Sequence, residues 1–162
     1  MEQCEMVLGA LDGMGIGYQL IEHPAVFTTE EADKYVEGIE GVRTKTLFLS
    51  NKKNTAHYLL VMDGAKRLDM KRLELLIPDR NIHFCSPERL MSKLGLFPGG
   101  VSLFGLLNNA EKDVKVLLDR AMLHERFISF HPNVNTRTAI ITMDDMFRFI
   151  EESGFSYTIL DL

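Results

Sequence analysis

Short segments with the alternating pattern of β-strands follow one another along this chain, and segments with helical spacing lie between most of them. Two strand patterns, Val42–Ser50 and His57–Met62, are separated only by the turn sequence Asn51–Asn54, which predicts an antiparallel hairpin. The other strand patterns are joined mostly through helices, which predicts crossovers. In all, about eight short strands and five or six helices are expected. The chain should therefore form a mixed α/β (α+β) fold and not a doubly wound parallel sheet.

Two of the expected helices carry clear start signals. Thr28 followed by Glu31 has the spacing of a capping box and predicts a helix that runs to about Val36. Ser86 followed by Pro87 places an N-cap residue before a proline in the first turn, so a second helix should begin there.

The size and composition are those of an ordinary globular protein. With 162 residues, of which 46% are hydrophobic and 25% charged, the chain is expected to form one domain over residues 1–162. Cys4 and Cys85 are far apart, and no targeting segment or membrane-spanning run is visible, so a soluble cytoplasmic protein is predicted. The net charge of −5 argues against a general nucleic-acid binder, although a local basic mouth is compatible with it. The basic stretch Lys66–Arg72 is expected to be a solvated helix face.

Several common catalytic and cofactor motifs are missing from the sequence. The glycine-rich segment at residues 95–105 contains neither GxGxxG nor GKS/T, so it is either a tight structural turn or a loop that aims backbone groups at a ligand. The five histidines are scattered and no HExxH or CxxC is present, so no metal is expected. Ser102 lacks the GxSxG context of a nucleophilic serine. The sequence therefore gives no support to a metal, a cofactor or a covalent nucleophile.

Two segments carry residues that are unusual for their setting. Lys45 lies in the middle of a predicted strand and shares a face with Leu47 and Leu49, where an unpaired ammonium group is costly to bury. It is either a lysine whose stem reaches out to solvent or a cation at the mouth of a pocket, where it would hold a phosphate or a carbonyl oxygen. The turn from His131 to Asn135 either uses proline and asparagine for their backbone preferences or holds an imidazole and two amides rigidly at a site.

Four segments, taken together and in order, give the chain a family resemblance. They are residues 23–28 (HPAVFT), 44–49 (TKTLFL), 99–108 (GGVSLFGLLN) and 131–138 (HPNVNTRT). Each is weakly specific, but their order and spacing resemble the YbaK/EbsC family, and specifically its ProX/PrdX branch, which is related to the editing domain inserted in bacterial prolyl-tRNA synthetases. The resemblance covers most of the chain. It implies a YbaK-like mixed sheet, partly closed like a barrel, with helices packed around it.

The resemblance also implies roles for individual residues. Lys45 matches the family's lysine near the terminal adenosine and its phosphate, and His131 matches the histidine of the substrate pocket. The glycine loop matches the segment that shapes the amino-acid pocket and offers backbone groups to the substrate. The resulting catalytic candidates are Lys45, His131 and Gly100. The substrate-binding candidates are Phe27, Thr28, Thr46, Gly99, Ser102, Asn133 and Asn135.

The sequence departs from the family pattern at three positions. Thr46 stands where many relatives have asparagine, Leu103 where many have proline, and Asn109 where many have aspartate. These departures leave the hydrolase class unchanged, but they leave open which amino acid is removed.

The implied activity is hydrolysis of the ester between an amino acid and the 3′ end of a mischarged tRNA, and in this branch the usual substrate is alanine on proline tRNA. Such an ester is already activated, so positioning it, orienting a water and stabilising the oxyanion could suffice without a cofactor. A small pocket would admit alanine and reject proline by size. The expected partners are the aminoacyl end of tRNA and prolyl-tRNA synthetase, with no membrane and with the oligomeric state left open. The alternative is a non-catalytic binding module that recognises proline or an aminoacyl group.

Overall fold

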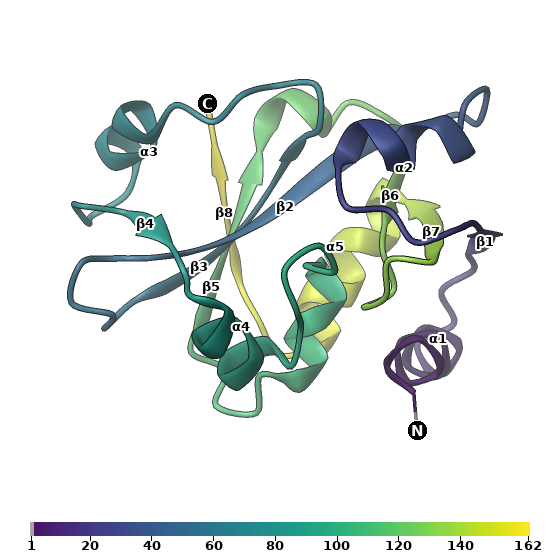
Figure 1. Ribbon diagram of the computed structural model, residues 1–162, viewed down its shortest axis with the longest axis horizontal. Helices are drawn as coiled ribbons and strands as arrows, with labels where there is room; N and C mark the ends of the chain where they lie inside the picture. Colours follow the sequence, from purple (N-terminus) through teal and green to yellow (C-terminus); the bar gives the residue numbers. More distant parts are fainter. Residues whose placement is uncertain (1) are drawn as a thin grey trace.

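One long strand, β2 (Val42–Ser50), organises the sheet of this protein. The computed structural model describes residues 2–162, apart from the side chain of Thr29, and Figure 1 shows its ribbon. The strands pair in the order β1-β7-β6-β2-β3-β5-β8, with β4 also pairing with β2. The bounds of the other strands are β1 (Gln19–Glu22), β3 (His57–Asp63), β4 (His83–Phe84), β5 (Val114–Asp119), β6 (Phe127–Phe130), β7 (Arg137–Thr142) and β8 (Tyr157–Leu160).

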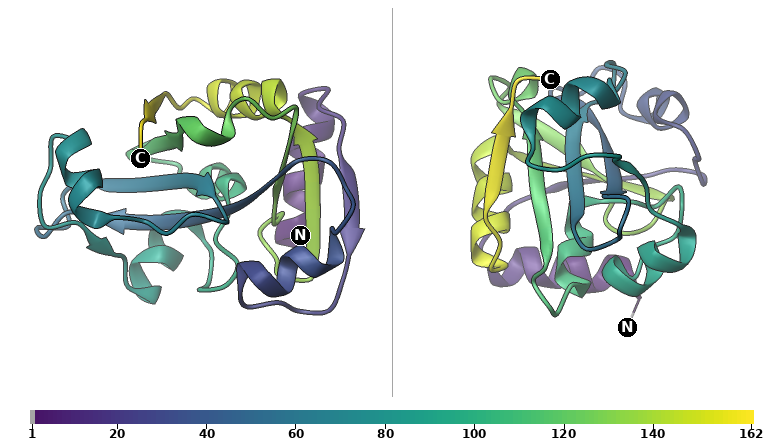
Figure 2. Two further views of the ribbon diagram at one scale, coloured as in Figure 1. Left: turned by 90° about the horizontal axis from the view of Figure 1, so that it is seen from above. Right: turned by 90° about the vertical axis from the view of Figure 1, so that its left-hand side faces the viewer.

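The sheet is mixed, as predicted. β2 pairs antiparallel with β3, which confirms the expected hairpin, and it pairs parallel with β6. β5 is parallel to both β3 and β8, whereas β7 is antiparallel to both β1 and β6. Figure 2 shows that the strands of the β1-β7-β6 part run across those of the β2-β3-β5-β8 part. This strong bend, with helices around it, agrees with the expected fold class.

β2 has a continuous neighbour on one edge but not on the other. β3 pairs along most of its length, whereas on the opposite edge β6 pairs only with its first two residues and β4 only with its last two. The carbonyl of Phe48 accepts from the N–H of Cys85 on this second edge, at 3.0 Å. Backbone groups of alternate strand residues point the same way, so the N–H and C=O of Thr46 face the same edge. Residues 44–48 therefore present an open stretch of sheet edge between β6 and β4.

Helices surround this sheet. Within the described residues they are α1 (Gln3–Gly13), α2 (Thr29–Tyr35), α3 (Met70–Leu76), α4 (Pro87–Leu94) and α5 (Met143–Glu152), together with the 3₁₀-helices η1 (Leu103–Asn108) and η2 (Arg120–Met122). Both predicted N-caps are confirmed, because Thr28 Oγ1 accepts from the N–H of Glu31 at 3.1 Å and Ser86 Oγ accepts from the N–H of Arg89 at 3.2 Å.

Two hydrophobic cores lie on the two faces of the sheet. The larger contains residues of both parts of the sheet and of α1, α4, η1 and α5, with Phe48, Phe104 and Phe149 among its largest members. The smaller lies on the other face of the β2-β3-β5 region under α3 and includes Tyr58 and Leu73. The side chains of β2 alternate between these two cores, as its sequence predicts.

The basic stretch Lys66–Arg72 is only partly a solvated helix face, because Lys71 and Arg72 are exposed on α3 but Lys66 is paired inside the molecule. Lys66 precedes the helix, and its ammonium lies 3.1 Å from a carboxylate oxygen of Asp119, whose side chain is fully buried. The burial of Asp119 requires such a partner, because an unpaired carboxylate in the core would be costly.

Across residues 2–162, no helix has the length and apolar character needed to span a membrane.

Candidate functional site

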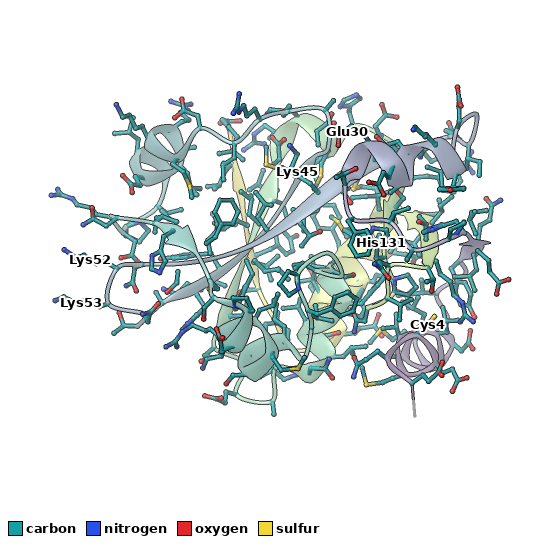
Figure 3. All side chains as sticks on the ribbon, viewed as in Figure 1. Cys4, Glu30, Lys45, Lys52, Lys53 and His131 are labelled. Atoms are coloured by element: carbon teal, nitrogen blue, oxygen red, sulfur yellow. The ribbon has the colours of Figure 1, made fainter. Side chains whose placement is uncertain are left out.

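A cavity of about 440 Å³ opens along the unpaired edge of β2. Its walls come from β2, from α2 and the segment before it, from β4 and the start of α4, from the glycine loop, and from β6 with the turn that follows. Figure 3 shows Lys45 and His131 in the half of the molecule near α2, away from Lys52 and Lys53 at the far end of the β2–β3 hairpin. The lining residues are Val26, Phe27, Thr28, Ala32, Asp33, Val36, Arg43, Thr44, Lys45, Thr46, Leu47, Phe48, Phe84, Cys85, Pro87, Leu90, Pro98, Gly99, Val101, Ser129, Phe130, His131 and Thr138.

His131 is held in a single tautomer at the cavity wall. Its Nδ1 lies 3.0 Å from the carbonyl oxygen of Arg137, and because a carbonyl only accepts, Nδ1 carries the proton. Nε2 has no hydrogen-bond partner among the described residues, and it is not sealed in the protein interior. Burial lowers the pKa of His131 below its ordinary 6.5, the nearby His23 lowers it further, and the bond to Arg137 acts in the opposite direction. At neutral pH the ring is therefore uncharged, with a free acceptor nitrogen.

His23 supports this wall from behind. Its Nδ1 donates to the carbonyl of Pro24 at 2.9 Å, so its Nε2 accepts from the hydroxyl of Thr138, also at 2.9 Å. The ring stacks on Tyr35 with centroids 5.1 Å apart and meets the ring of His131 edge-on at 6.2 Å. Both nitrogens of His23 are engaged, so this histidine links α2 to β7 and positions its neighbour.

Lys45 lines the cavity from the middle of β2. It is half-buried and lies opposite Met62 of β3, so its side chain starts on the face that it shares with Leu47 and Leu49. Among residues 2–162, no carboxylate lies within ion-pair distance of its ammonium group. A half-buried ammonium without an internal partner is suited to an anionic or carbonyl ligand in the cavity.

Asp33 of α2 brings a carboxylate to the same cavity. It is half-buried, and burial raises its pKa above the ordinary 3.8, with Glu30 and Asp63 adding to the rise and Arg43 opposing it. Arg43 itself donates to the carbonyls of Val36, Ile39 and Gly41 and so ties the segment after α2 to β2. The helix that carries Asp33 is thereby fixed at the cavity.

The glycine loop contributes less to the cavity than predicted. Gly99 lines it, with a φ of 93° that favours glycine. Gly100 and Ser102 do not line it. The N–H of Gly100 already donates to the carbonyl of Phe97 at 3.0 Å, and Ser102 is fully buried with its hydroxyl capping η1 through the N–H of Phe104 at 3.2 Å. Gly100 and Ser102 therefore have structural roles within the loop, and their contacts with substrate stay a prediction.

The two asparagines of the turn after His131 also have structural roles. Asn133 is buried, adopts a φ of 61°, and donates to Gln3 of α1 at 3.2 Å. Asn135 donates through its side chain to the carbonyl of Val26 at 3.0 Å, and its carbonyl accepts from the N–H of Val26 at 3.1 Å. Neither residue lines the cavity, but Asn135 fixes the segment that brings Phe27 and Thr28 to it.

The structure also adds residues that the sequence did not single out. Asp33 lies in none of the segments that carry the family resemblance, whereas His23 and Thr138 lie in two of them but were given no role of their own. Cys85 lines the cavity, but burial raises the pKa of its thiol to about 11, with Arg89 opposing, so it remains protonated at neutral pH. In the part of the chain that the structure describes, no three His, Cys, Asp or Glu side chains are grouped as a metal site.

Comparisons with known proteins agree with one another. The profile of the family described as "Aminoacyl-tRNA editing domain" matches residues 23–149. The chain is 33% identical over 163 residues to the prolyl-tRNA editing protein ProX of Acetoanaerobium sticklandii, with 100% of this chain and 99% of that protein covered. It is 34% identical over 152 residues to the prolyl-tRNA synthetase associated domain-containing protein 1 of Danio rerio, with 93% and 82% covered.

The fold is also found among solved structures. A protein described as a candidate trans-editing enzyme for prolyl tRNA synthetase superposes with a TM-score of 0.76 at 22% identity, with 100% of this chain and 98% of that chain covered. A scaffold protein from an epitope-grafting design superposes with a TM-score of 0.79 at 20% identity, with 100% and 97% covered. At these identities the likeness supports the fold alone.

Proposed function

The chain belongs to the aminoacyl-tRNA editing domain family, and on this basis we propose that it is a hydrolase that removes the amino acid from mischarged tRNA. The substrate that we propose is proline tRNA carrying alanine, because similar proteins are named for prolyl-tRNA editing and for association with prolyl-tRNA synthetase. The observation that carries the proposal is the cavity on the open edge of β2, where Lys45, Asp33 and the neutral His131 all contribute to the wall.

The reaction adds water across the aminoacyl ester. The water oxygen bonds to the carbonyl carbon, the bond from that carbon to the ribose 3′ oxygen breaks, and the ribose oxygen takes up a proton. The products are a free amino acid and an uncharged tRNA. Because the ester is already activated, the site must mainly place the ester and the water and stabilise negative charge on the carbonyl oxygen.

In this proposal His131 and the open edge of β2 form hydrogen bonds with the reacting atoms. The free Nε2 of His131 accepts a hydrogen bond from the attacking water and can take its proton as the tetrahedral intermediate forms. A vicinal ribose hydroxyl of the substrate can assist. The N–H of Thr46 on the open edge is the backbone donor best placed for the oxyanion, since the N–H of Gly100 is already bonded to Phe97.

Lys45 and Asp33 hold the charged parts of the substrate in this proposal. The ammonium of Lys45 binds the phosphate or the terminal adenosine by charge-assisted contacts. The carboxylate of Asp33, the one acidic side chain on the described cavity wall, pairs with the α-ammonium group of the amino acid. The two opposite charges orient the ester along the edge of β2.

Selection of alanine over proline rests on size. Apolar side chains of Val26, Val36 and Phe130 are nearly fully buried where they border the cavity. Closely packed walls of this kind reject a side chain with additional ring atoms by steric exclusion, whereas alanine adds only a methyl group. Gly99 and Phe27, which approach each other at the mouth, complete the enclosure.

The direct test is deacylation of alanyl-, cysteinyl- and prolyl-tRNA(Pro) by the purified protein and by Lys45→Ala. We expect alanine to be released and proline to be spared, and we expect kcat/KM of the variant to fall roughly 100-fold or more, because charge-assisted contacts to the substrate are lost. Lys52→Ala is the matched control, because Lys52 lies on the exposed turn of the hairpin, outside the cavity. Unchanged turnover in Lys45→Ala would remove Lys45 from the mechanism.

The second candidate function is a binding module for proline or an aminoacyl group. It shares the same cavity and would be favoured if the folded wild-type protein bound an uncleavable aminoacyl-tRNA analogue but hydrolysed none of the three esters. The free Nε2 of His131 favours the hydrolase, because a pure binder has no use for an uncharged proton acceptor beside an ester.

The proposed partners follow from the proposed reaction. The aminoacyl 3′ end of tRNA enters the cavity, and the synthetase that charges proline tRNA is the enzyme whose errors this activity would correct. We propose a cytoplasmic location on the same ground, because the substrate is an intermediate of protein synthesis.

A further inference from the structure

Exposed aromatic side chains gather at the mouth of the cavity. Phe27 is 69% exposed and Phe84 is 57% exposed, and both line the cavity. Phe97 is 40% exposed and packs against the position of Gly100, in the loop whose Gly99 and Val101 also line the cavity. The three rings come from three separate segments, namely the approach to α2, β4 and the loop after α4. Exposed apolar side chains that are grouped in this way mark a binding surface, whereas apolar side chains that are exposed singly need no such explanation.

Phe84 stands on the same face of the sheet as Lys45. It pairs with Leu49 across β2 and β4, and directly paired residues share a face, which here is also the face of Leu47 and Lys45. The cavity lining therefore includes the ring of Phe84, the ammonium group of Lys45, which has no internal partner, and the ring of Phe27. A cation set among exposed aromatic rings is the arrangement that binds single-stranded nucleic acid, where bases stack on rings and phosphates meet the cation.

Hydrogen bonds hold the backbone that carries these rings. The N–H of Phe27 donates to the carboxylate of Glu31 at 3.2 Å, next to the cap of α2. Phe84 lies between the pairing of β4 with β2 and the hydrogen bond from Cys85 to Phe48 at 3.0 Å. Rings on fixed backbone lose little conformational freedom when a flat partner stacks on them, which favours binding.

We propose that Phe27 and Phe84, with Phe97 beside them, form the stacking surface for the unpaired nucleotides at the 3′ end of the tRNA. This rests on the proposed function, because that end must cross the mouth to bring its ester into the cavity. The occupant is RNA rather than a protein, because a protein partner covering these rings would also close the entrance to the substrate. The net charge of −5 is compatible with this, since a chain with five more acidic than basic side chains gains little from phosphate contacts alone and depends more on stacking.

The test separates binding from turnover. A fluorescent RNA hairpin that imitates the tRNA acceptor stem, and that carries no amino acid, is titrated with the wild type, Phe84→Ala, Phe27→Ala and Leu75→Ala. Binding is measured by fluorescence anisotropy. Leu75 is the matched control, because it is 79% exposed on α3 and does not line the cavity. We expect Phe84→Ala and Phe27→Ala each to weaken Kd roughly tenfold, Leu75→Ala to leave it unchanged, and Phe84→Tyr to restore it.

A second hairpin without the unpaired 3′ nucleotides identifies which part of the RNA is bound. For this probe the wild type should bind as weakly as Phe84→Ala does, and the alanine substitution should cause no further loss. Equal losses on both probes, or a Kd within twofold of the wild type for both phenylalanine variants, would overturn the proposal. Because the probe carries no amino acid, a failure to hydrolyse any aminoacyl ester would contradict the proposed function without affecting this result.

Discussion

Two histidines at this cavity have the same tautomer but different uses. His23 and His131 each precede a proline and each donate Nδ1–H to a backbone carbonyl. His23 then engages Nε2 with Thr138, whereas the Nε2 of His131 has no partner in the described part of the chain. The two sequences, His-Pro in both cases, cannot show this difference, because it depends on a hydroxyl that lies 115 residues further along the chain from His23.

The activity should fall only below pH 6.5. Burial lowers the pKa of His131, so the neutral ring persists at pH 6.5 and is protonated as the pH falls through this lowered value. We therefore expect kcat/KM for alanyl-tRNA, corrected for uncatalysed hydrolysis, to stay level from about pH 8 to about pH 6.5 and to fall at lower pH. His131→Asn should lower the plateau and abolish this acid limb. An acid limb centred at or above pH 6.5 in the wild type would contradict the role of His131.

Asp33→Asn should weaken recognition of the free amino group. The variant keeps the size of the side chain but removes the charge that would pair with the α-ammonium group, so we expect KM for alanyl-tRNA to rise roughly tenfold. The decisive comparison uses N-acetyl-alanyl-tRNA, which has no ammonium group. The wild type and the variant should have the same KM for this substrate. A similar loss on both substrates would show that Asp33 supports the structure of α2 and does not contact the amino group.

Local signals predicted the helices well because their causes are local. The caps at Thr28 and Ser86 each act over three residues, and both form as their sequence spacing indicates. The same chemistry explains why Ser102 was proposed as a substrate contact. A hydroxyl beside glycines suits a substrate loop, but it equally suits an N-cap, and here it caps η1. Sequence alone could not separate these uses, because both require only a hydroxyl at a chain reversal.

Two glycines in helical segments should respond oppositely to alanine. At Gly105 in η1 an added Cβ would lie 2.6 Å from Leu96 and 3.3 Å from Leu94, both fully buried. We expect Gly105→Ala to lower the free energy of unfolding by about 1–3 kcal/mol through overpacking. At Gly9 in α1 nothing lies within 4 Å of an added Cβ, so Gly9→Ala should raise it by about 0.5–1 kcal/mol. Urea unfolding measures both, and equal effects of the two substitutions would refute the packing argument.

The open edge of β2 was beyond prediction from sequence because it depends on distant pairings. The strand itself was predicted over Val42–Ser50, and the structure has the same bounds. What makes it a site is that β6, some 85 residues later, stops pairing after Arg43, while the short β4 begins only at Leu49. Part of the cavity wall, including Lys45 and His131, could thus be named from a family resemblance, whereas Asp33 and the backbone groups that face the cavity could not.

Acidification should lower the free energy of unfolding over two pH ranges. The first involves the partly buried, neutral His131. Because its pKa in the folded state is lowered, the stability that it contributes is fully present above pH 6.5 and is lost as the pH falls through the lower folded value. The second involves Asp79, whose pKa is lowered chiefly by the hydroxyl of Tyr58 at 2.6 Å, and Asp113, whose pKa is lowered chiefly by Lys93 at 2.5 Å. Each of these carboxylates stabilises the fold above about pH 3.9, the ordinary value in an unfolded chain, and stops doing so as the pH falls through its lower folded value.

The Tyr58→Phe variant tests the contribution of the hydrogen bond between Tyr58 and Asp79 at acidic pH. The variant keeps the buried ring and removes the hydroxyl that donates to Asp79, so it should be less stable than the wild type at pH 6. Because the lost bond lowers the pKa of Asp79 in the wild type, the difference in free energy of unfolding should stay constant down to about pH 4 and shrink below it. Urea unfolding of both proteins at closely spaced pH values gives this difference directly. A difference that persists unchanged to pH 2 would show that Tyr58 stabilises the fold independently of the charge on Asp79.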